Sequence, residues 1–349
     1  MRLIQSETTQ NEKVQLLTSD SNPIVLPASE RRGDLPSTLS FYGVDRVLAE
    51  YCNADSEVVP DRFSWQHGWC SCARQAVDPI LLIQEPVIEP SKMYLVARQD
   101  EAEYMAEHGL QSQAMGLPFV YAQPISAVRI PNSLLVMPAH SLEYTQHQWK
   151  FESYVRQIAE IADRFDRVVA CIHPSCVHKG YWQPQFEAAG IQCVTGSDAY
   201  DANGLVRIKT LLSQFEFMTT NMLGSHVVYA AAMGARVSIF GDYAEYKAED
   251  FASSEYYNLH PHVLQPILRL YSELYARKTY PQFDCEPWEA VSATNWAAME
   301  LGLDKRRSPA EIRQLFGWDS VSIAKRRFKQ LSRSLSRGPE KMVKRLLSR

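Results

Sequence analysis

Residues 215–242, FEFMTTNMLGSHVVYAAAMGARVSIFGD, decide the fold of this chain. Their pattern predicts a strand over Phe215–Thr219, a polar loop over Thr220–Gly224, a helix over Ser225–Met233 that stops at Gly234, and a strand over Arg236–Phe240. Where the loop becomes the helix, free backbone N–H groups at the positive end of the helix dipole suit a phosphate, and the Ser225 hydroxyl can add a hydrogen bond. A serine that merely caps an ordinary βαβ turn is the alternative interpretation.

The same alternation precedes this segment. Strands are predicted at Leu134–Met137, Arg167–Ile172 and Gln192–Thr195, with helices over Phe151–Phe165 and Gly204–Leu212 between them. Strands that alternate with helices at this pitch predict an α/β fold with a parallel, doubly wound sheet.

Polar motifs follow three of these strands. They are His140-Ser141, His173-Pro174-Ser175, and Thr220-Asn221 with Gly224-Ser225-His226. Because the carboxyl ends of parallel strands share one edge, and ligands of such sheets bind outside that edge, the three motifs together predict a ligand site.

The residues up to about 130 predict a first α/β unit whose strand order cannot be read. Strand candidates are 57–60, 81–83, 93–96 and 116–124, and a helix opens at Asp100 and ends at Gly109. The stretch from Asp61 onward, DRFSWQHGWCSCARQ, is expected to be a loop that presents His67 and Gly68. A histidine titrates near neutral pH and can act as a general base, whereas a ring that only packs is the alternative.

The composition is that of a globular protein. The chain has 349 residues, 46% apolar and 22% charged, with no apolar run long enough to cross a bilayer and no signal-peptide core at its N-terminus. Seven scattered cysteines suit reduced thiols, which favours a cytoplasmic location. Neither a metal-binding cluster nor a cofactor is predicted, and no feature predicts nucleic-acid binding.

Charge is unevenly distributed along the chain. The net charge is −4, yet residues 321–349 hold ten Lys or Arg and one acid, Glu340. Apolar residues at helical spacing lie among these cations, which predicts a basic amphipathic helix that attaches to an anionic membrane surface. A solvated charged tail is the alternative. The expected organisation is therefore 1–130 as an acceptor-side α/β domain, 131–260 as a nucleotide-donor domain, 261–320 as a helical region and 321–349 as the basic tail.

The motifs QHGW, HPSC and NMLGSH, in this order and at this spacing, resemble bacterial surface-polysaccharide glycosyltransferases of the GT-B type. The HP and serine motifs are similar to those of sialyl- and Kdo-transferases, in which they hold the nucleotide and phosphate of a CMP-sugar. The HG motif is similar to that of teichoic-acid glycerophosphotransferases, in which its histidine is catalytic.

This resemblance implies two Rossmann-like domains that face a cleft. It implies that His173, Pro174, Ser175, Thr220, Asn221, Gly224, Ser225 and His226 bind the donor, with Gly68, His140 and Ser141 elsewhere in the cleft. His67 would be the base, and Asp61 is the nearest acid. The acidic motif that carries the base of sialyltransferases is not evident, so the donor stays open between a CMP-sugar, another nucleotide-sugar and CDP-glycerol.

The expected function is the metal-independent transfer of a sugar from a nucleotide donor to a surface polysaccharide or a lipid-linked acceptor at the inner face of the inner membrane. Fixed N–H dipoles, Ser225 and a histidine would stabilise the charge that builds on the leaving phosphate. Two alternatives remain open. One is another sugar-nucleotide enzyme of the same shape, such as an epimerase, or a glycerophosphotransferase, and the other is a non-catalytic scaffold of a polysaccharide-assembly complex.

Overall fold

The computed structural model describes residues 14–16, 23–35, 37–54, 60–71, 89–259 and 261–319. Five parallel strands form the larger sheet in the order β10 (Arg236–Ile239), β9 (Phe215–Thr220), β6 (Ile130–Val136), β7 (Arg167–Ile172) and β8 (Gln192–Thr195). Three parallel strands form the smaller sheet, namely β3 (Phe63–Trp65), β4 (Met93–Val96) and β5 (Gln111–Ala114). The predicted α/β class with two parallel sheets is confirmed.

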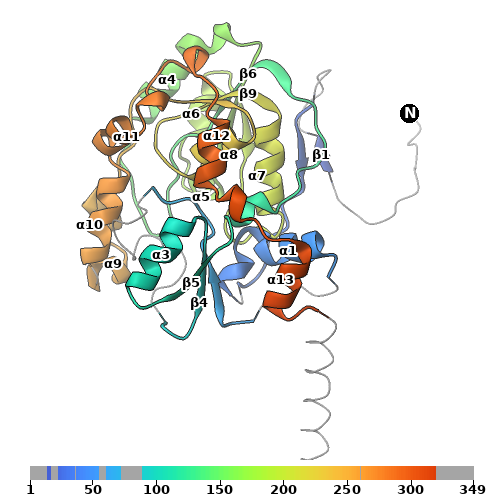
Figure 1. Ribbon diagram of the computed structural model, residues 1–349. Coiled ribbons are helices and arrows are strands. Elements are labelled where there is room, and N and C mark those ends of the chain that lie inside the picture. Colours follow the sequence, from blue (N-terminus) through green and yellow to red (C-terminus); the bar gives the residue numbers. More distant parts are fainter. Residues whose placement is uncertain are drawn as a thin grey trace, which may run out of the picture.

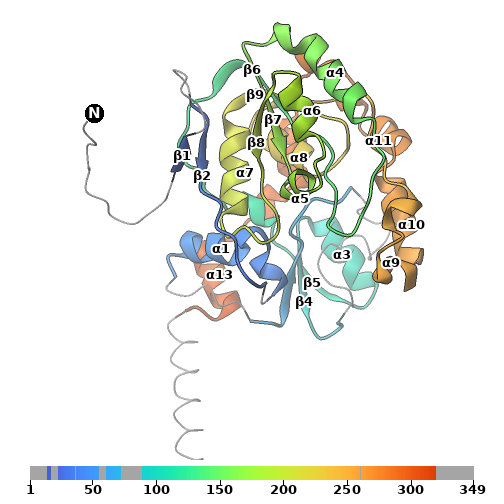
Figure 2. The ribbon, with the colours of Figure 1, turned by 180° about the vertical axis from the view of Figure 1, so that it is seen from behind.

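Helices cover both faces of the larger sheet because its strands are apolar on both sides. Leu135 and Met218 point to one face, where they share a buried cluster with α7 (Gly204–Ser213) and α8 (Ser225–Ala232). Their neighbours Leu134 and Phe217 point to the other face and pack with α4 (Phe151–Ile161), α5 (Pro174–His178) and α6 (Gln183–Ala188). Figure 1 shows the side of α7 and α8, and Figure 2 shows the side of α4 and α6. This is the doubly wound arrangement that the sequence predicts.

The first part of the chain differs from its prediction in two places. Residues 63–65 form β3 rather than a loop, and the strand expected at 116–124 lies earlier, as β5. Gly116 turns the chain with a φ of +76°, and Pro118 then begins a short 3₁₀ turn, Pro118–Val120. The strand candidates at 57–60 and 81–83 lie wholly or mostly outside the described residues.

The remaining elements surround these sheets. They are the antiparallel ribbon of β1 (Val14–Leu16) and β2 (Val25–Pro27), the 3₁₀ segment Thr38–Gly43 with α1 (Val44–Cys52), and α3 (Gln99–Glu107).

The region after residue 260 is helical, as predicted. It contains α10 (Pro261–Leu270), α11 (Glu273–Thr279), α12 (Thr294–Glu300) and α13 (Pro309–Phe316), and it follows the short α9 (Glu255–Leu259).

This helical region returns to the first part of the chain. Helix α12 packs on α8, and α13 packs on α1. The ring of Phe316, in α13, also contacts Phe63 of β3 edge-on, with 5.1 Å between the ring centroids. One buried cluster therefore contains residues from the smaller sheet, the larger sheet and α13. The domain boundaries at 130, 260 and 320 stay predictions. The basic tail, 321–349, lies outside the described residues.

Candidate functional site

The carboxyl edges of the two sheets face each other. The loop after β3 meets the start of α8, which follows β9: the Trp69 N–H donates to Ser225 Oγ at 2.9 Å, and the Tyr229 hydroxyl donates to the His67 carbonyl at 3.1 Å. A Cβ on Gly68 would lie 3.0 Å from Ser225 Oγ, so glycine allows this close approach. The structure thus joins the HG and serine motifs directly.

The loop that carries His67 is fixed on its other side. The Trp69 indole donates to Glu300 of α12 at 2.7 Å, and the backbone N–H of Ala97, after β4, donates to the Gln66 side chain at 3.0 Å. Trp69 is 2% exposed, so this anchor is buried. Because the loop is held by three elements, the position of His67 is set by the fold.

The His67 ring lies against Phe41 and Tyr42, with centroids 5.4 and 5.7 Å away. Its Nδ1 is buried without a hydrogen-bond partner, and among the described residues Nε2 has none either. Burial lowers the pKa of His67 to about 4. The ring is therefore neutral at physiological pH, as a base must be.

Tyr42, whose ring contacts His67, has a strained backbone conformation. Its φ is +55°, which is rare for a non-glycine residue, and its N–H donates to the carbonyl of Ala199, in the segment after β8, at 2.8 Å. A Cβ on Gly204 would lie 3.1 Å from the Tyr42 Cα, so glycine at the start of α7 allows the close approach of Tyr42. Strain of this kind is maintained only where surrounding structure imposes it, and it is frequent at functional sites. No pattern in the sequence pointed to Tyr42.

Asp61 lies elsewhere. It is exposed in the turn before β3, at the amino end of that strand, whereas His67 follows the carboxyl end. The structure does not bring these two residues together.

Three histidines meet at the carboxyl edge of the larger sheet. The rings of His140, after β6, and His173, after β7, are 4.8 Å apart, and His226 lies in the first turn of α8. Burial lowers the pKa of His140 to about 4 and that of His226 to about 3. Burial also lowers the pKa of His173 well below its usual value, and the nearby His140 lowers it to a smaller extent. The structure thus assembles three neutral imidazoles from the predicted motifs.

Other predicted donor residues are engaged within the protein. Asn221 is fully buried, accepts from the Ala139 N–H at 2.9 Å and donates to the Asp242 carbonyl at 3.1 Å. Thr220, also buried, has its hydroxyl 2.8 Å from His226 Nε2. These two residues brace the loops at the edge and position His226.

The HPSC motif is tied to the loop after β6. The Ser175 hydroxyl donates to the Ser141 carbonyl, and the Ser141 N–H donates to Cys176 Sγ at 3.1 Å. Pro174 occupies the first position of α5, and His173 caps that helix by accepting from the Ser175 N–H at 3.2 Å. Ser141 and Ser175 are both buried, so they hold the two loops together.

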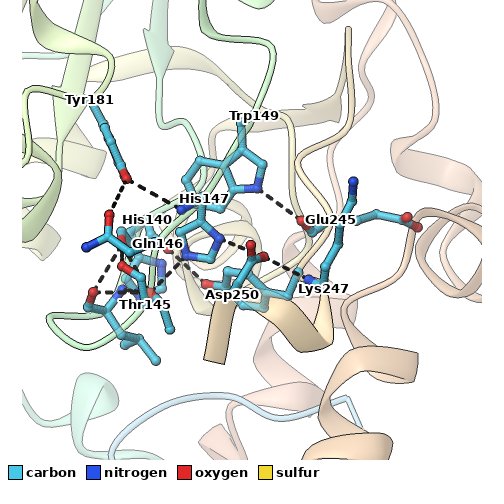
Figure 3. A network of polar contacts seen from close by, with 12 residues as sticks. His140, Thr145, Gln146, His147, Trp149, Tyr181, Glu245, Lys247 and Asp250 are labelled. Atoms are coloured by element: carbon cyan, nitrogen blue, oxygen red, sulfur yellow. Dashed lines mark hydrogen bonds and ion pairs between the residues drawn. The ribbon is translucent and has the colours of Figure 1, made fainter. Parts of the chain in front are cut away.

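A buried network behind His140 carries no sequence signal and was missed. His147 Nδ1 lies 2.9 Å from Asp250 Oδ2, and Nε2 lies 2.9 Å from Thr145 Oγ1, while the ring stacks on Trp149 at 4.0 Å (Figure 3). Thr145, His147 and Asp250 are arranged in the order of the nucleophile, base and acid of a catalytic triad. However, Thr145 is fully buried and its hydroxyl is already bonded to Leu142, so the network holds the loop that carries His140.

A cavity of about 460 Å³ lies at the carboxyl ends of β7 and β8. It is lined by Ser29, Arg31, Pro174, His178, Thr195, Gly196, Asp198 and Arg207. Apart from Pro174, none of these residues belongs to the predicted site. Hydroxyl, carboxylate and guanidinium groups in one cavity suit a polar organic ligand.

Within the described ranges, no group of three or more His, Cys, Asp or Glu side chains is arranged to hold a metal ion. Among the helices of the same ranges, none is both long and apolar enough to span a membrane.

Comparison with known proteins gives only distant structural matches. No family model matches the chain, and no curated protein does. Among solved structures, the pneumococcal O-GlcNAc transferase GtfA, in complex with UDP and GlcNAc, matches with a TM-score of 0.33 and 10% identity over 75% of this chain and 52% of that one. A GtfA/B complex matches with a TM-score of 0.29 and 10% identity over 72% and 53%.

This chain spans about half the length of the two structures. At these scores the two matches decide neither activity nor ligand. The finer resemblance to sialyl- and Kdo-transferases has no match behind it.

Proposed function

We propose that this chain transfers a sugar from a nucleotide-activated donor to an acceptor hydroxyl at the facing carboxyl edges. The observation that carries the proposal is the direct contact between the HG loop and the start of α8, where Trp69 donates to Ser225. It places His67, whose ring nitrogens have no partner among the described residues, on a loop beside the start of α8 from the other sheet.

In the proposed reaction, His67 takes the proton from the acceptor hydroxyl. The acceptor oxygen forms a bond to the anomeric carbon as the bond from that carbon to the phosphate oxygen breaks. The electron pair of the broken bond stays on the phosphate, where the N–H groups at the start of α8 and the three imidazoles can stabilise it.

The Ser225 hydroxyl is bonded to Trp69 in this structure, so it has a second task beyond the predicted phosphate contact. A phosphate at the start of α8 meets the backbone N–H groups and His226, and the serine links this phosphate site to the loop that carries His67. Loss of Ser225 therefore disturbs both halves of the site.

In this proposal the nucleoside of the donor occupies the 460 Å³ cavity, which borders the HPSC motif through Pro174. We propose a CMP-sugar as the favoured donor, on the HP and serine motifs, and a polysaccharide or lipid-linked glycan as the acceptor. The basic tail would hold the chain at an anionic membrane surface.

Nucleotide binding tests this proposal first. Thermal unfolding is measured with CMP, CDP, UDP and GDP, because a ligand at a hundred times its Kd stabilises a protein by about 2.7 kcal/mol. At least one nucleotide should raise the melting temperature of the wild type, and the His173→Ala variant should lose most of that rise. If none of the four nucleotides stabilises the chain at millimolar concentration, the donor site is not here.

A further inference from the structure

The three histidines differ in their hydrogen bonds. His173 Nδ1 accepts from the Ser175 N–H and lies 2.8 Å from the Ser175 hydroxyl, and His226 Nε2 lies 2.8 Å from the Thr220 hydroxyl. By contrast, within the described residues the ring nitrogens of His140 have no partner, and only its backbone carbonyl is engaged, by the Tyr246 hydroxyl at 2.9 Å. Protonation of His140 therefore breaks no hydrogen bond that the structure shows.

Lys179 has no hydrogen-bond donor left for a phosphate oxygen. Its Nζ donates to Ser141 Oγ at 2.8 Å and to the carbonyls of Leu142 and Thr145, so its three N–H donors already face three acceptors. His147 is paired with Asp250.

The titratable and charged groups around His140 and its loop are Glu143, Tyr144, His147, His173, Cys176, Lys179, His226, Tyr246 and Asp250. Among these, the three imidazoles at the edge are neutral because burial lowers their pKa values. The terminal phosphate group of a free nucleotide carries a charge of about −1.5 to −2 at neutral pH. A dianion that leaves water loses its hydration, and neutral imidazoles return less of that free energy than an imidazolium does. A proton on one imidazole therefore makes the cluster a better phosphate site.

We propose that His140 takes up a proton from solvent when a phosphate group binds at this edge, and that the imidazolium then donates a hydrogen bond to a phosphate oxygen. The inference rests on the proposed function, since the phosphate is the terminal group of the nucleotide that the donor releases. The imidazolium also stabilises the charge that develops on the phosphate when the bond between its oxygen and the sugar breaks.

The experiment counts protons by calorimetry. CMP, CDP, UDP and GDP are titrated into the full chain at about pH 7.5, in buffers of different ionisation enthalpy, since a terminal phosphate with a pKa near 6 is then almost fully deprotonated. The slope of the observed enthalpy against the buffer enthalpy gives the number of protons taken up. We expect about one proton per bound nucleotide and a Kd that rises about tenfold per pH unit from pH 7 to 8.5.

The His140→Asn variant keeps a polar side chain that cannot be protonated. It should bind with a proton count near zero and a Kd that no longer depends on pH in this range. His108→Asn is the matched control, because His108 is exposed on the segment after α3; it should behave as the wild type. A wild type that takes up no proton, or a His140→Asn variant that still takes one up, overturns the inference.

The wild-type count needs no variant, and histidine NMR gives a second readout if His140→Asn does not fold. One of the nine imidazoles should change from neutral to protonated when nucleotide is added at about pH 7.5. No change in any imidazole contradicts the inference. Nucleotide binding without proton uptake refutes the role of His140 and leaves the proposed function standing, whereas failure of all four nucleotides to bind refutes the proposed function itself.

Discussion

Replacement of His67 by asparagine should remove the base of the proposed reaction and leave the donor site intact. The ring contacts Phe41 and Tyr42, and the loop itself is held by Trp69 and Gln66 through bonds that do not involve the His67 side chain. Lost ring contacts of this kind cost about 1–2 kcal/mol of stability, so the variant is expected to fold.

The expected kinetic effect is that of losing a general base which is unprotonated in nearly every molecule. With a pKa of about 4, about one His67 in a thousand is protonated at pH 7, so nearly every molecule carries the base. Its loss should lower kcat by about 10²–10⁴-fold, which equals about 2.7–5.4 kcal/mol of transition-state stabilisation.

The assay compares kcat at saturating donor and acceptor, and nucleotide Kd, for wild type, His67→Asn and the exposed control His108→Asn. The Kd should stay close to the wild-type value while kcat falls only for His67→Asn. Histidine NMR of the wild type should place the His67 pKa below 5. A normal kcat for His67→Asn, or a His67 pKa near 6.5, would refute the reasoning.

Three further outcomes are expected. Ser225→Ala leaves the buried backbone N–H of Trp69 without its acceptor. A denaturant titration should show a free energy of unfolding lowered by about 1–3 kcal/mol, and nucleotide binding should weaken. Unchanged stability would show that the contact contributes nothing. The native state binds fewer protons than the unfolded state at His140, so the free energy of unfolding should fall as pH drops from about 6.5 to 4. In denaturant titrations at pH 7 and pH 5, His140→Asn should lose about 2 kcal/mol less of this free energy than the wild type. Equal losses would contradict a neutral His140 ring. The full chain should co-sediment with anionic liposomes at low salt, whereas a chain that ends at Asp319, which retains the buried Trp318, should not; equal binding by both refutes attachment by the tail.

The larger sheet could be predicted from the sequence because its strands are apolar on both faces and are separated by amphipathic helices. Leu134 and Leu135 point to opposite clusters, and α4 presents Tyr154 and Ile158 to one of them. The same logic placed His140 and His173 at one edge, since β6 and β7 are parallel neighbours. Alternation of elements and shared strand direction are local signals that a sequence carries.

The rest depends on contacts between distant parts of the chain. Strand β5, QSQA, has no apolar alternation, and it is a strand because β4 pairs with it. The link from Trp69 to Ser225 spans 156 residues, and the link from His147 to Asp250 spans 103. No local pattern predicts such pairs, which is why Tyr42, the buried His147 network and the cavity beside Pro174 were missed.

The most direct test of the proposed function is a transfer assay. The full chain is incubated with CMP-, UDP- and GDP-activated sugars and water-soluble glycan acceptors, and mass spectrometry follows the free nucleotide and the acceptor together. We predict that one donor releases its nucleotide as the acceptor gains the mass of one sugar residue, in equal amounts, and that His67→Asn nearly abolishes both. Bound nucleotide without release from any donor, or a donor that is interconverted while no acceptor gains mass, would contradict the proposed transferase.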